Sequence, residues 1–405
     1  MKRIFLILRL LLEVKFIFKS PQKYELVVFD DDAIYDLKNF INSYNYFILE
    51  TVNPIADVTK TSHKVYLSFK LLKYFFKNYK GNIKTAYMVS LLEIINPKVV
   101  LTTIDNSYKF SDVARILDQK MTFIAIQNAA RIDIHETKYL YGKKKIESDF
   151  TEKLYIPNFL CFGQYEIDQY RGYKIKVKNF FKIGSLRLAN FLHHIKKNNI
   201  EPKKIIYDIC LVSEQKNFIE ENIEKGFSYT AKFTIKFCMK HNMKLIWACK
   251  RDKKITPQKY NLELDYYKKH LTDNEFKYLI DNSREKKIFD FTSYMSMIQS
   301  KVAVGNVSTL LRENLGMGRK ILSLNSTGLN VYDFPIQGIC SMQNCTFEEF
   351  EKRLLQIISM SEKDYFSQLN RDKSYVAEFS EENSTIEKIK NKIDFFLNDQ
   401  SSPKN

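Results

Sequence analysis

The chain has 405 residues, of which 45% are hydrophobic and 27% are charged. This balance excludes a largely disordered chain, and the length predicts two domains that each bury a core. Lysine and arginine number 64 against 47 aspartate and glutamate residues, a formal net charge of +17. Because the lysines are dispersed and no nucleic-acid-binding motif occurs, we expect an anionic membrane surface or an acidic sugar as partner, and no nucleic acid.

The N-terminal stretch Met1–Leu12 imitates a signal peptide, but Arg9 interrupts its apolar run and no small-residue cleavage site follows. It is also too short and too charged to span a bilayer. We predict a helix or strand packed on the first domain, or an amphipathic helix on the membrane surface. We therefore expect a cytoplasmic protein that is loosely attached, as a peripheral protein, to the inner face of the cytoplasmic membrane.

Apolar runs alternate with helical patterns through the first half of the chain, which favours a parallel sheet with helical crossovers. The helix predicted over Val65–Tyr79 has an aromatic stripe opposite a lysine face. We interpret it as a core-facing helix, with contact to a membrane or a partner as the alternative. The other elements that we predict are strands at Tyr24–Phe29, Tyr46–Glu50, Lys98–Thr103, Phe123–Gln127, Ile156–Phe162 and Phe180–Ile183, and helices at Ala33–Asn42 and Ile83–Ile95.

Polar residues follow two neighbouring strands of this predicted sheet. Asp105 comes directly after the strand Lys98–Thr103, and the strand Phe123–Gln127 runs into a polar turn. The carboxyl ends of parallel strands form the edge where open α/β sheets bind ligands. We predict Asp105 as the catalytic carboxylate, with a turn-forming aspartate as the alternative. The substrate-binding residues that we predict at the same edge, where a plain polar turn is the alternative, are Asn106, Gln127, Asn128 and Arg131.

The six cysteines lie far apart and lack Cys-x-x-Cys spacing, and the six histidines show no metal-ligand spacing. This pattern favours neither a zinc site nor a disulfide framework. We expect buried free thiols in a reducing compartment, and no metal site.

Asn190–Lys203 is the predicted linker, because it combines lysines and asparagines with Pro202. Strands are then predicted at Ile205–Val212 and Lys244–Cys249. Lys250 and Arg251 follow the second of these strands at the edge where ligands bind. We predict that they neutralise phosphate groups, with a solvated basic loop as the alternative.

The stretch Lys287–Asn325 predicts strand, helix, strand, helix and strand in turn. Its middle strand ends at Gly305 and Asn306, and Ser308 and Thr309 open the next helix. A glycine, two hydroxyl groups and the free N–H groups of a helix N-terminus make up the composition of an anion site, most simply for a phosphate or diphosphate. The alternative is a helix cap that binds no ligand.

The motifs from Gly305 onward resemble the C-terminal, nucleotide-binding half of GT-B glycosyltransferases. They are Gly-x-x-Ser-Thr, Leu-x-x-Glu and Gly-x-Gly-Arg-Lys before an apolar strand. Families that share this half include Kdo and sialic-acid transferases, CDP-glycerol polymerases and UDP-GlcNAc 2-epimerases. Over roughly residues 85–360 the chain is most similar to bacterial surface carbohydrate biosynthesis proteins, which resemble the retaining β-Kdo transferases of capsule and O-antigen assembly.

The resemblance implies an α/β fold of two Rossmann-like domains that face a cleft. It implies an acceptor-side domain over residues 1–190, a nucleotide-sugar-binding domain over 203–380 and a C-terminal helix within 381–405 that crosses back. By resemblance, Glu313 would bind a ribose hydroxyl, while Ser293 and Tyr294 would border the base. The residues predicted around the phosphate are Gly305, Asn306, Ser308, Thr309, Lys250 and Arg251.

We predict a glycosyltransferase that moves a sugar, such as Kdo or another acidic sugar, from a CMP-linked donor to a glycan or lipid-linked acceptor of surface polysaccharide synthesis. Asp105 would be the nucleophile of a retaining reaction or the base of an inverting one. The helix dipole and nearby cations would meet the charge of the departing phosphate, so that no metal or cofactor is required. The alternatives are a CDP-polyol phosphotransferase, a UDP-GlcNAc 2-epimerase-like enzyme and a non-catalytic scaffold in envelope glycan assembly.

Overall fold

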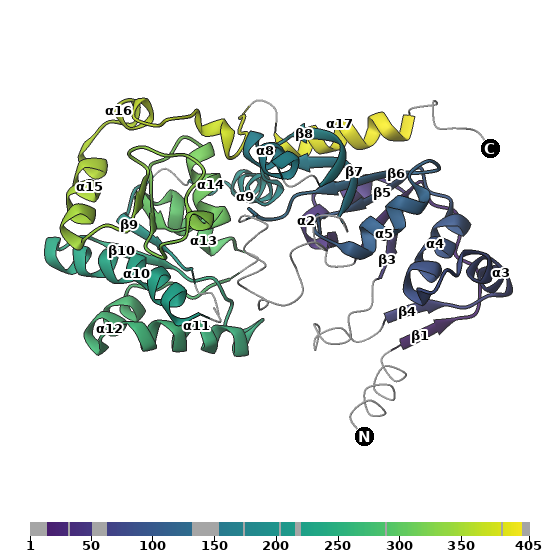
Figure 1. Cartoon of the computed structure of the whole chain (residues 1–405), viewed down its shortest axis with the longest axis horizontal. Helices are drawn as coiled ribbons and strands as arrows, with labels where there is room; N and C mark the ends of the chain where they lie inside the picture. Colours follow the sequence, from purple (N-terminus) through teal and green to yellow (C-terminus); the bar gives the residue numbers. More distant parts are fainter. Residues whose placement is uncertain are drawn as a thin grey trace, which may run out of the picture.

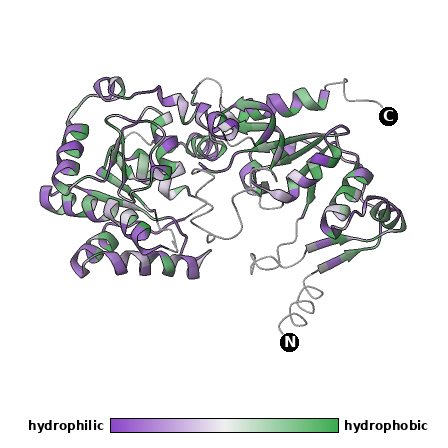
Figure 2. Cartoon of the chain, in the orientation of Figure 1, coloured by the Kyte–Doolittle hydropathy of each residue, from purple (hydrophilic) through white to green (hydrophobic). Residues whose placement is uncertain are grey.

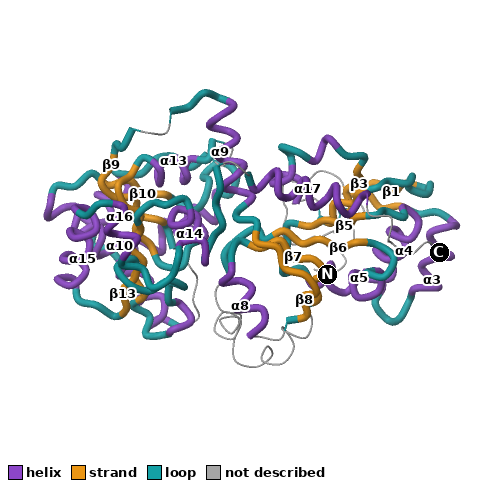
Figure 3. The backbone as a smooth tube through the Cα atoms, turned by 90° about the horizontal axis from the view of Figure 1, so that it is seen from above, coloured by secondary structure: helices purple, strands orange, loops and turns teal. Residues whose placement is uncertain are grey.

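The structure is a computed structural model, and it describes residues 14–30, 33–50, 63–131, 154–172, 175–201, 204–214, 220–287, 290–381 and 384–398. Two parallel sheets, each covered by helices, occupy separate halves of the molecule (Figure 1). The predicted α/β class with two Rossmann-like units is therefore confirmed. Figure 3 shows the two sheets following one another along the long axis, with helix α9 (Leu186–Lys197) between them.

The N-terminal sheet has six parallel strands, and helices cover both of its faces. Side chains alternate between the faces of a strand, so Val27 and Phe29 join one apolar cluster while Leu26 and Val28 join another. Burial on both faces explains why these strands are nearly continuous apolar runs. In spatial order the strands are β3 (Tyr46–Leu49), β2 (Leu26–Phe29), β5 (Val99–Thr102), β6 (Thr122–Ile126), β7 (Tyr155–Cys161) and β8 (Lys176–Lys182).

Helices of the N-terminal half divide between the two faces. The cluster with Val27 includes residues of α4 (Ile83–Ile95), α5 (Tyr108–Leu117) and α8 (Gln164–Gly172), and the cluster with Leu26 includes residues of α2 (Ala33–Leu37) and α9. Asn82 caps α4 by accepting hydrogen bonds from two N–H groups, and Asn96 ends the helix with a φ of 53°. These caps explain why the sequence predicted both ends of α4 correctly.

The C-terminal sheet has five parallel strands, in spatial order β10 (Leu245–Ala248), β9 (Tyr207–Val212), β11 (Ser300–Gly305), β12 (Ile321–Asn325) and β13 (Ser341–Gln343). The strand order reverses between β9 and β11, and such a switch point is where open α/β sheets bind ligands. One apolar cluster forms the core of this half. Its helices are α10 (Glu221–His241), α11 (Pro257–His270), α12 (Asp273–Asp281), α13 (Thr292–Ile298), α14 (Thr309–Gly316), α15 (Phe347–Ser359) and α16 (Glu362–Ser367).

The chain returns to the N-terminal half at its end. Helix α17 (Thr385–Asn398) buries Ile389, Ile393 and Leu397 in the cluster of the N-terminal sheet, where Figure 1 shows it in yellow. The segment before it passes between the halves at close range. A Cβ atom on Gly163 would lie 2.6 Å from the carbonyl oxygen of Tyr375, and one on Gly316 would lie 2.7 Å from that of Ala377. Glycine is therefore required at both contacts.

Two predicted elements are wrong. Val65–Tyr79 is not one helix, because β4 (His63–Tyr66) pairs with β1 (Val14–Ile17) in a separate two-stranded sheet, and α3 begins only at Phe69 after the Ser68 cap. The predicted linker Asn190–Lys203 is helical as far as Lys197 in α9. The physical reason is apolar spacing, because Leu188, Phe191 and Ile195 of α9 pack into the core of the C-terminal half.

Some predictions fall outside the described residues. Those for Met1–Leu12 do so entirely, and the strand predicted near 288–291 does so in part, with Asp290 lying in a turn before α13. The described thiols are buried as predicted, except that Cys345 is half-buried. Among the helices of the described ranges, none combines the length and hydrophobicity needed to cross a bilayer.

Candidate functional site

The predicted phosphate site lies where β11 ends, at the switch point of the C-terminal sheet. Gly305 is tightly enclosed, because a Cβ atom there would lie 3.0 Å from Leu311 and 3.3 Å from the Glu214 carboxylate. Asn306 is fully buried, and its side-chain N–H donates to the carbonyl oxygen of Leu324 at 2.7 Å. Both residues therefore shape the turn that leads into α14.

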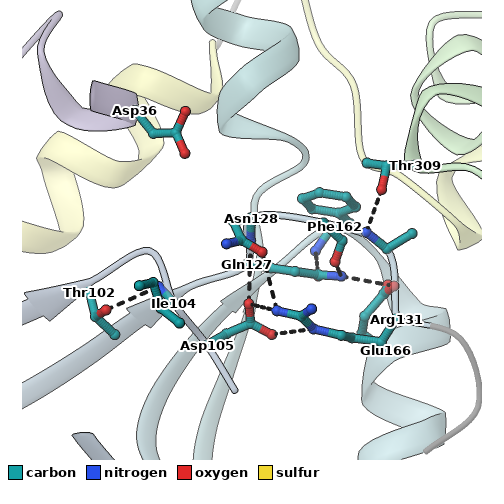
Figure 4. A network of polar contacts seen from close by, with 12 residues as sticks. Asp36, Thr102, Ile104, Asp105, Gln127, Asn128, Arg131, Phe162, Glu166 and Thr309 are labelled. Atoms are coloured by element: carbon teal, nitrogen blue, oxygen red, sulfur yellow. Dashed lines mark hydrogen bonds and ion pairs between the residues drawn. The ribbon is translucent and has the colours of Figure 1, made fainter. Parts of the chain in front are cut away.

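The N-terminus of α14 lacks a side-chain cap. Ser308 occupies the cap position with a φ of −67° and a ψ of 142°, yet its hydroxyl makes no cap hydrogen bond. The hydroxyl of Thr309 instead accepts a hydrogen bond of 2.8 Å from the backbone N–H of Ala130, in the loop after β6 (Figure 4). The first N–H groups of a helix have no partner inside the helix. The helix end thus keeps its capacity to bind an anion, and Thr309 joins it to the N-terminal half.

Glu313 is buried one turn further along α14, with 1% of its surface exposed. Its Oε1 accepts hydrogen bonds from the hydroxyls of Ser185 and, at 3.0 Å, Tyr294, while Oε2 has no partner among the described residues. Burial raises the pKa of Glu313 to about 7, against the lowering effect of these two hydrogen bonds. At neutral pH this carboxyl group therefore has both protonation states available, with one oxygen still able to take a partner.

The end of β10 gathers cations. The backbone N–H groups of Lys250 and Arg251 donate to the buried carboxylate of Glu263 at 2.8 and 2.9 Å, which fixes the direction of this loop. Lys286 donates to the hydroxyl of Ser293, and burial lowers the pKa of its ammonium group. Lys286 and Glu263 were not among the predicted site residues, because neither belongs to a motif typical of a phosphate site.

Asp105 lies at the end of β5 with 1% of its surface exposed. Figure 4 shows its carboxylate facing Arg131, which binds it through two nitrogens, with Nε at 2.9 Å from Oδ2. The hydroxyl of Tyr170 lies 3.4 Å from the same carboxylate, and the backbone N–H of Asn128 also reaches it at 3.4 Å. Burial alone would lower the pKa of Arg131, but Asp105 raises it. Asp105 therefore lies after β5 as the sequence predicted, and it forms a structural ion pair there.

The other predicted substrate-binding residues differ in their surroundings. Gln127 is buried, accepts from the N–H of Phe162 at 2.8 Å and donates to Glu166 at 3.1 Å. The amide oxygen of Asn128 accepts from Arg131 at 3.2 Å. Asn106 is exposed, and its side chain forms no hydrogen bond with another described residue. Gln127 and Asn128 thus hold the loop in place, and Asn106 is the one whose side chain faces solvent.

A buried ion pair joins the two halves between these groups. Arg312 of α14 donates to Glu166 of α8 at 2.8 Å and to the carbonyl oxygen of Arg131 at 2.9 Å. Its guanidinium also lies 4.6 Å from the centre of the Tyr165 ring. This pair brings the Asp105 side and the α14 side together. No signal in the sequence could reveal it, because its partners are 146 residues apart.

One more ion pair missed by the sequence analysis lies near Glu313. Arg187 of α9 binds Asp36 of α2 at 3.2 Å, and about half of the Arg187 side chain is exposed. Ser185, which binds Glu313, precedes it by two residues. Figure 4 shows Asp36 apart from the Asp105 network. Asp36 and Arg187 therefore form a second polar group beside α14.

Comparison with known proteins shows the fold. No protein-family model and no curated protein matches the chain. A UDP-GlcNAc 2-epimerase from Methanocaldococcus jannaschii, in complex with UDP-GlcNAc and UDP, has a TM-score of 0.50 and 10% identity, covering 91% of this chain and 99% of its own. S. aureus MnaA with UDP has a TM-score of 0.51 and 11% identity, covering 93% and 97%. A putative UDP-N-acetylglucosamine 2-epimerase from Listeria monocytogenes has a TM-score of 0.51 and 10% identity, covering 95% and 99%.

The ion pair predicts the effect of replacing Asp105. Asp105→Asn leaves the partly buried guanidinium of Arg131 without a counter-ion, so the free energy of unfolding should fall by on the order of 3 kcal/mol. The same change at the exposed Asp290, whose Lys287 partner is 3.9 Å away, should cost less than about 1 kcal/mol. In a double-mutant cycle by urea unfolding, Arg131→Met should couple to Asp105→Asn, and additive effects would contradict this role.

Glu313 predicts a dependence of stability on pH. Because its pKa is raised from 4.5 to about 7, the folded chain keeps a proton that the unfolded chain releases. The stabilisation is complete below about pH 4.5 and is lost as the pH rises through about 7. Glu313→Gln should remove a decline on the order of 3 kcal/mol between about pH 4.5 and 7. Glu285→Gln, at an exposed position, is the control, and equal slopes for Glu313→Gln and wild type would refute the assignment.

Proposed function

We propose that the chain is a glycosyltransferase that uses a nucleotide sugar. The observation that carries this proposal is the uncapped N-terminus of α14, which stands at the switch point of one sheet and against the polar loops of the other. Helix N-termini bind phosphate through their free N–H groups and their partial positive charge. A helix cap alone, the alternative to a ligand, is disfavoured, because neither Ser308 nor Thr309 caps the helix with its hydroxyl.

In this proposal the phosphate groups of the donor contact the hydroxyl of Ser308 and the first N–H groups of α14. Glu313 binds a ribose hydroxyl through Oε2, the oxygen that lacks a partner among the described residues. Its raised pKa suits this role, since a protonated carboxyl can donate and an ionised one can accept. Ser293 and Tyr294 border the base. Cations at the end of β10 offset the phosphate charge, so the proposal needs no metal or cofactor.

The acceptor would be a glycan or lipid-linked molecule of surface polysaccharide synthesis, and it would bind on the N-terminal half. Asp105 is the carboxylate proposed to act there, and Arg131 and Asn128 hold it in place. Arg131 would contact the carboxylate of an acidic sugar only through Nη1, because its Nε and Nη2 bind Asp105. By resemblance we propose a CMP-linked acidic sugar such as Kdo as donor. If Asp105 acts chemically, Asp105→Asn should lose at least ~100-fold in turnover at temperatures where it is still fully folded.

Donor class can be tested by measuring melting temperatures with a panel of CMP-, CDP- and UDP-sugars, because a ligand of the folded state raises apparent stability. Transfer of a labelled sugar to a membrane extract would support the proposal. Conversion of UDP-GlcNAc to its 2-epimer without acceptor would replace it with the epimerase alternative. Binding of none of these compounds would favour a non-catalytic scaffold.

Ser308→Ala separates a ligand site from a cap. This variant should keep its melting temperature, because no cap hydrogen bond is lost, while its nucleotide affinity falls about 10- to 100-fold. The matched control is Ser361→Ala in α16, where the hydroxyl does cap, accepting from the N–H of Asp364 at 3.1 Å. That variant should lose roughly 0.5–2 kcal/mol of stability and keep its nucleotide affinity. Calorimetry that finds unchanged affinity for Ser308→Ala would refute the phosphate site.

A further inference from the structure

The far end of the N-terminal half exposes an unusual set of large apolar side chains. Phe18, Phe69, Phe76 and Ile83 are 79%, 93%, 73% and 64% exposed. Leu72 lies between Phe69 and Phe76 on α3 (Phe69–Asn78), Tyr79 directly follows this helix, and both are also exposed. We define the α3 face as these four residues together with Ile83 at the start of α4 and Phe18 in the segment after β1. Figure 1 shows α3, β1 and β4 at the end of the molecule away from the C-terminal half.

Helix α3 is apolar on two sides, but only one side meets the protein. Leu71 is buried against the body of the domain, where α3 packs on α4. Phe69, Leu72 and Phe76 are spaced by three and four residues, so they share the other side of the helix. Figure 2 shows apolar and polar residues alternating around α3. A contiguous row of large apolar side chains exposed along one side of a helix typically marks a surface that binds a partner.

The two stretches of chain that carry the α3 face contain lysines and no carboxylates. Residues 14–24 contain three lysines and residues 63–84 contain six, and neither stretch contains an aspartate or glutamate. These nine lysines, all exposed, account for more than half of the net charge of +17. The carboxylate of the nearby Glu93 accepts hydrogen bonds from Asn78 at 2.7 Å and from Lys120 at 2.8 Å. The face therefore combines apolar side chains with an excess of positive charge, beside which Glu50 accepts a hydrogen bond of 2.9 Å from the backbone N–H of Lys64.

A groove opens beside the α3 face, between α3, α4 and β4. It is lined by the apolar side chains of Val65, Phe75, Ile83 and Met88, by three lysines and by the carboxylate of Glu50, and its volume is about 250 Å³. Such a groove can receive an apolar chain whose head group is anionic. Apolar side chains that insert between lipids, with lysines that attract anionic head groups, are the two components of interfacial membrane binding.

We propose that the α3 face binds an anionic lipid bilayer. A second copy of the chain is disfavoured as partner, because a two-fold interface would bring the same lysines together. A bilayer is favoured over nucleic acid because the aliphatic side chains of Leu72 and Ile83 are exposed among the rings and an apolar groove opens beside them. Single-stranded RNA, whose bases stack on exposed rings, is the competing outcome of the test. This proposal goes beyond glycosyl transfer and does not depend on it, since membrane binding needs neither donor nor acceptor.

The test is sedimentation of the full chain with vesicles, without nucleotide. Binding to mixed phosphatidylglycerol–phosphatidylcholine vesicles should exceed binding to phosphatidylcholine alone by at least ~10-fold, and should weaken in high salt. The triple change Lys70→Gln, Lys73→Gln and Lys77→Gln should reduce partitioning about 100-fold, at roughly fivefold per lysine. Its control is Lys259→Gln, Lys268→Gln and Lys277→Gln on α11 and α12, which should bind as wild type does.

A second variant tests the apolar component. Phe69→Ser with Phe76→Ser should reduce vesicle binding at least ~10-fold and leave the melting temperature unchanged, because both rings are exposed. Phe395→Ser, at a 58% exposed position on α17, is the control. A lower melting temperature with unchanged vesicle binding would show that the chain itself covers the face. A dimer lost in the variant, or binding to single-stranded RNA in place of vesicles, would likewise overturn the proposal.

Discussion

Every feature of the candidate site depends on one short helix that is buried between two sheets. Leu310–Gly316 of α14 are all buried, and Arg312 among them would be costly there without a counter-ion. Glu166 of the other half supplies that counter-ion at 2.8 Å. A buried ion pair adds little net stability, because both charges lose their water. Separating the partners nevertheless costs several kcal/mol, so the pair holds the two halves in one arrangement. The position of α14 against the N-terminal half follows from it.

This placement links the chemistry proposed for the two halves. Arg312 bonds to the carbonyl of Arg131, and Arg131 holds Asp105, so that one chain of polar contacts runs from α14 to the end of β5. Thr309 makes a parallel connection through Ala130. A change in the angle between the halves would disturb both connections at once. A ligand bound at the α14 N-terminus would therefore lie on the same chain of contacts as the loops after β5 and β6.

The sequence predicted what local patterns control. The ends of α4, the strands of the two main sheets other than β13 and the Ser308–Glu313 segment follow from caps, apolar runs and short motifs. It did not predict the Arg312–Glu166 pair, whose partners meet only through the packing of two sheets. The helical spacing of Leu188, Phe191 and Ile195 was a local signal for α9, but the surrounding lysines and asparagines favoured a linker instead. Strand β13 has only three residues, too few to show a period.

We propose that the uncapped end of α14 binds the phosphate of a nucleotide between the two halves. A crystal structure of the full chain with its best-stabilising nucleotide tests it most directly. We expect a phosphate oxygen within hydrogen-bond distance of the Ser308 hydroxyl and the first N–H groups of α14, with the ribose beside Glu313. A nucleotide bound at another place on the chain, with the α14 end in contact with solvent alone, would contradict it.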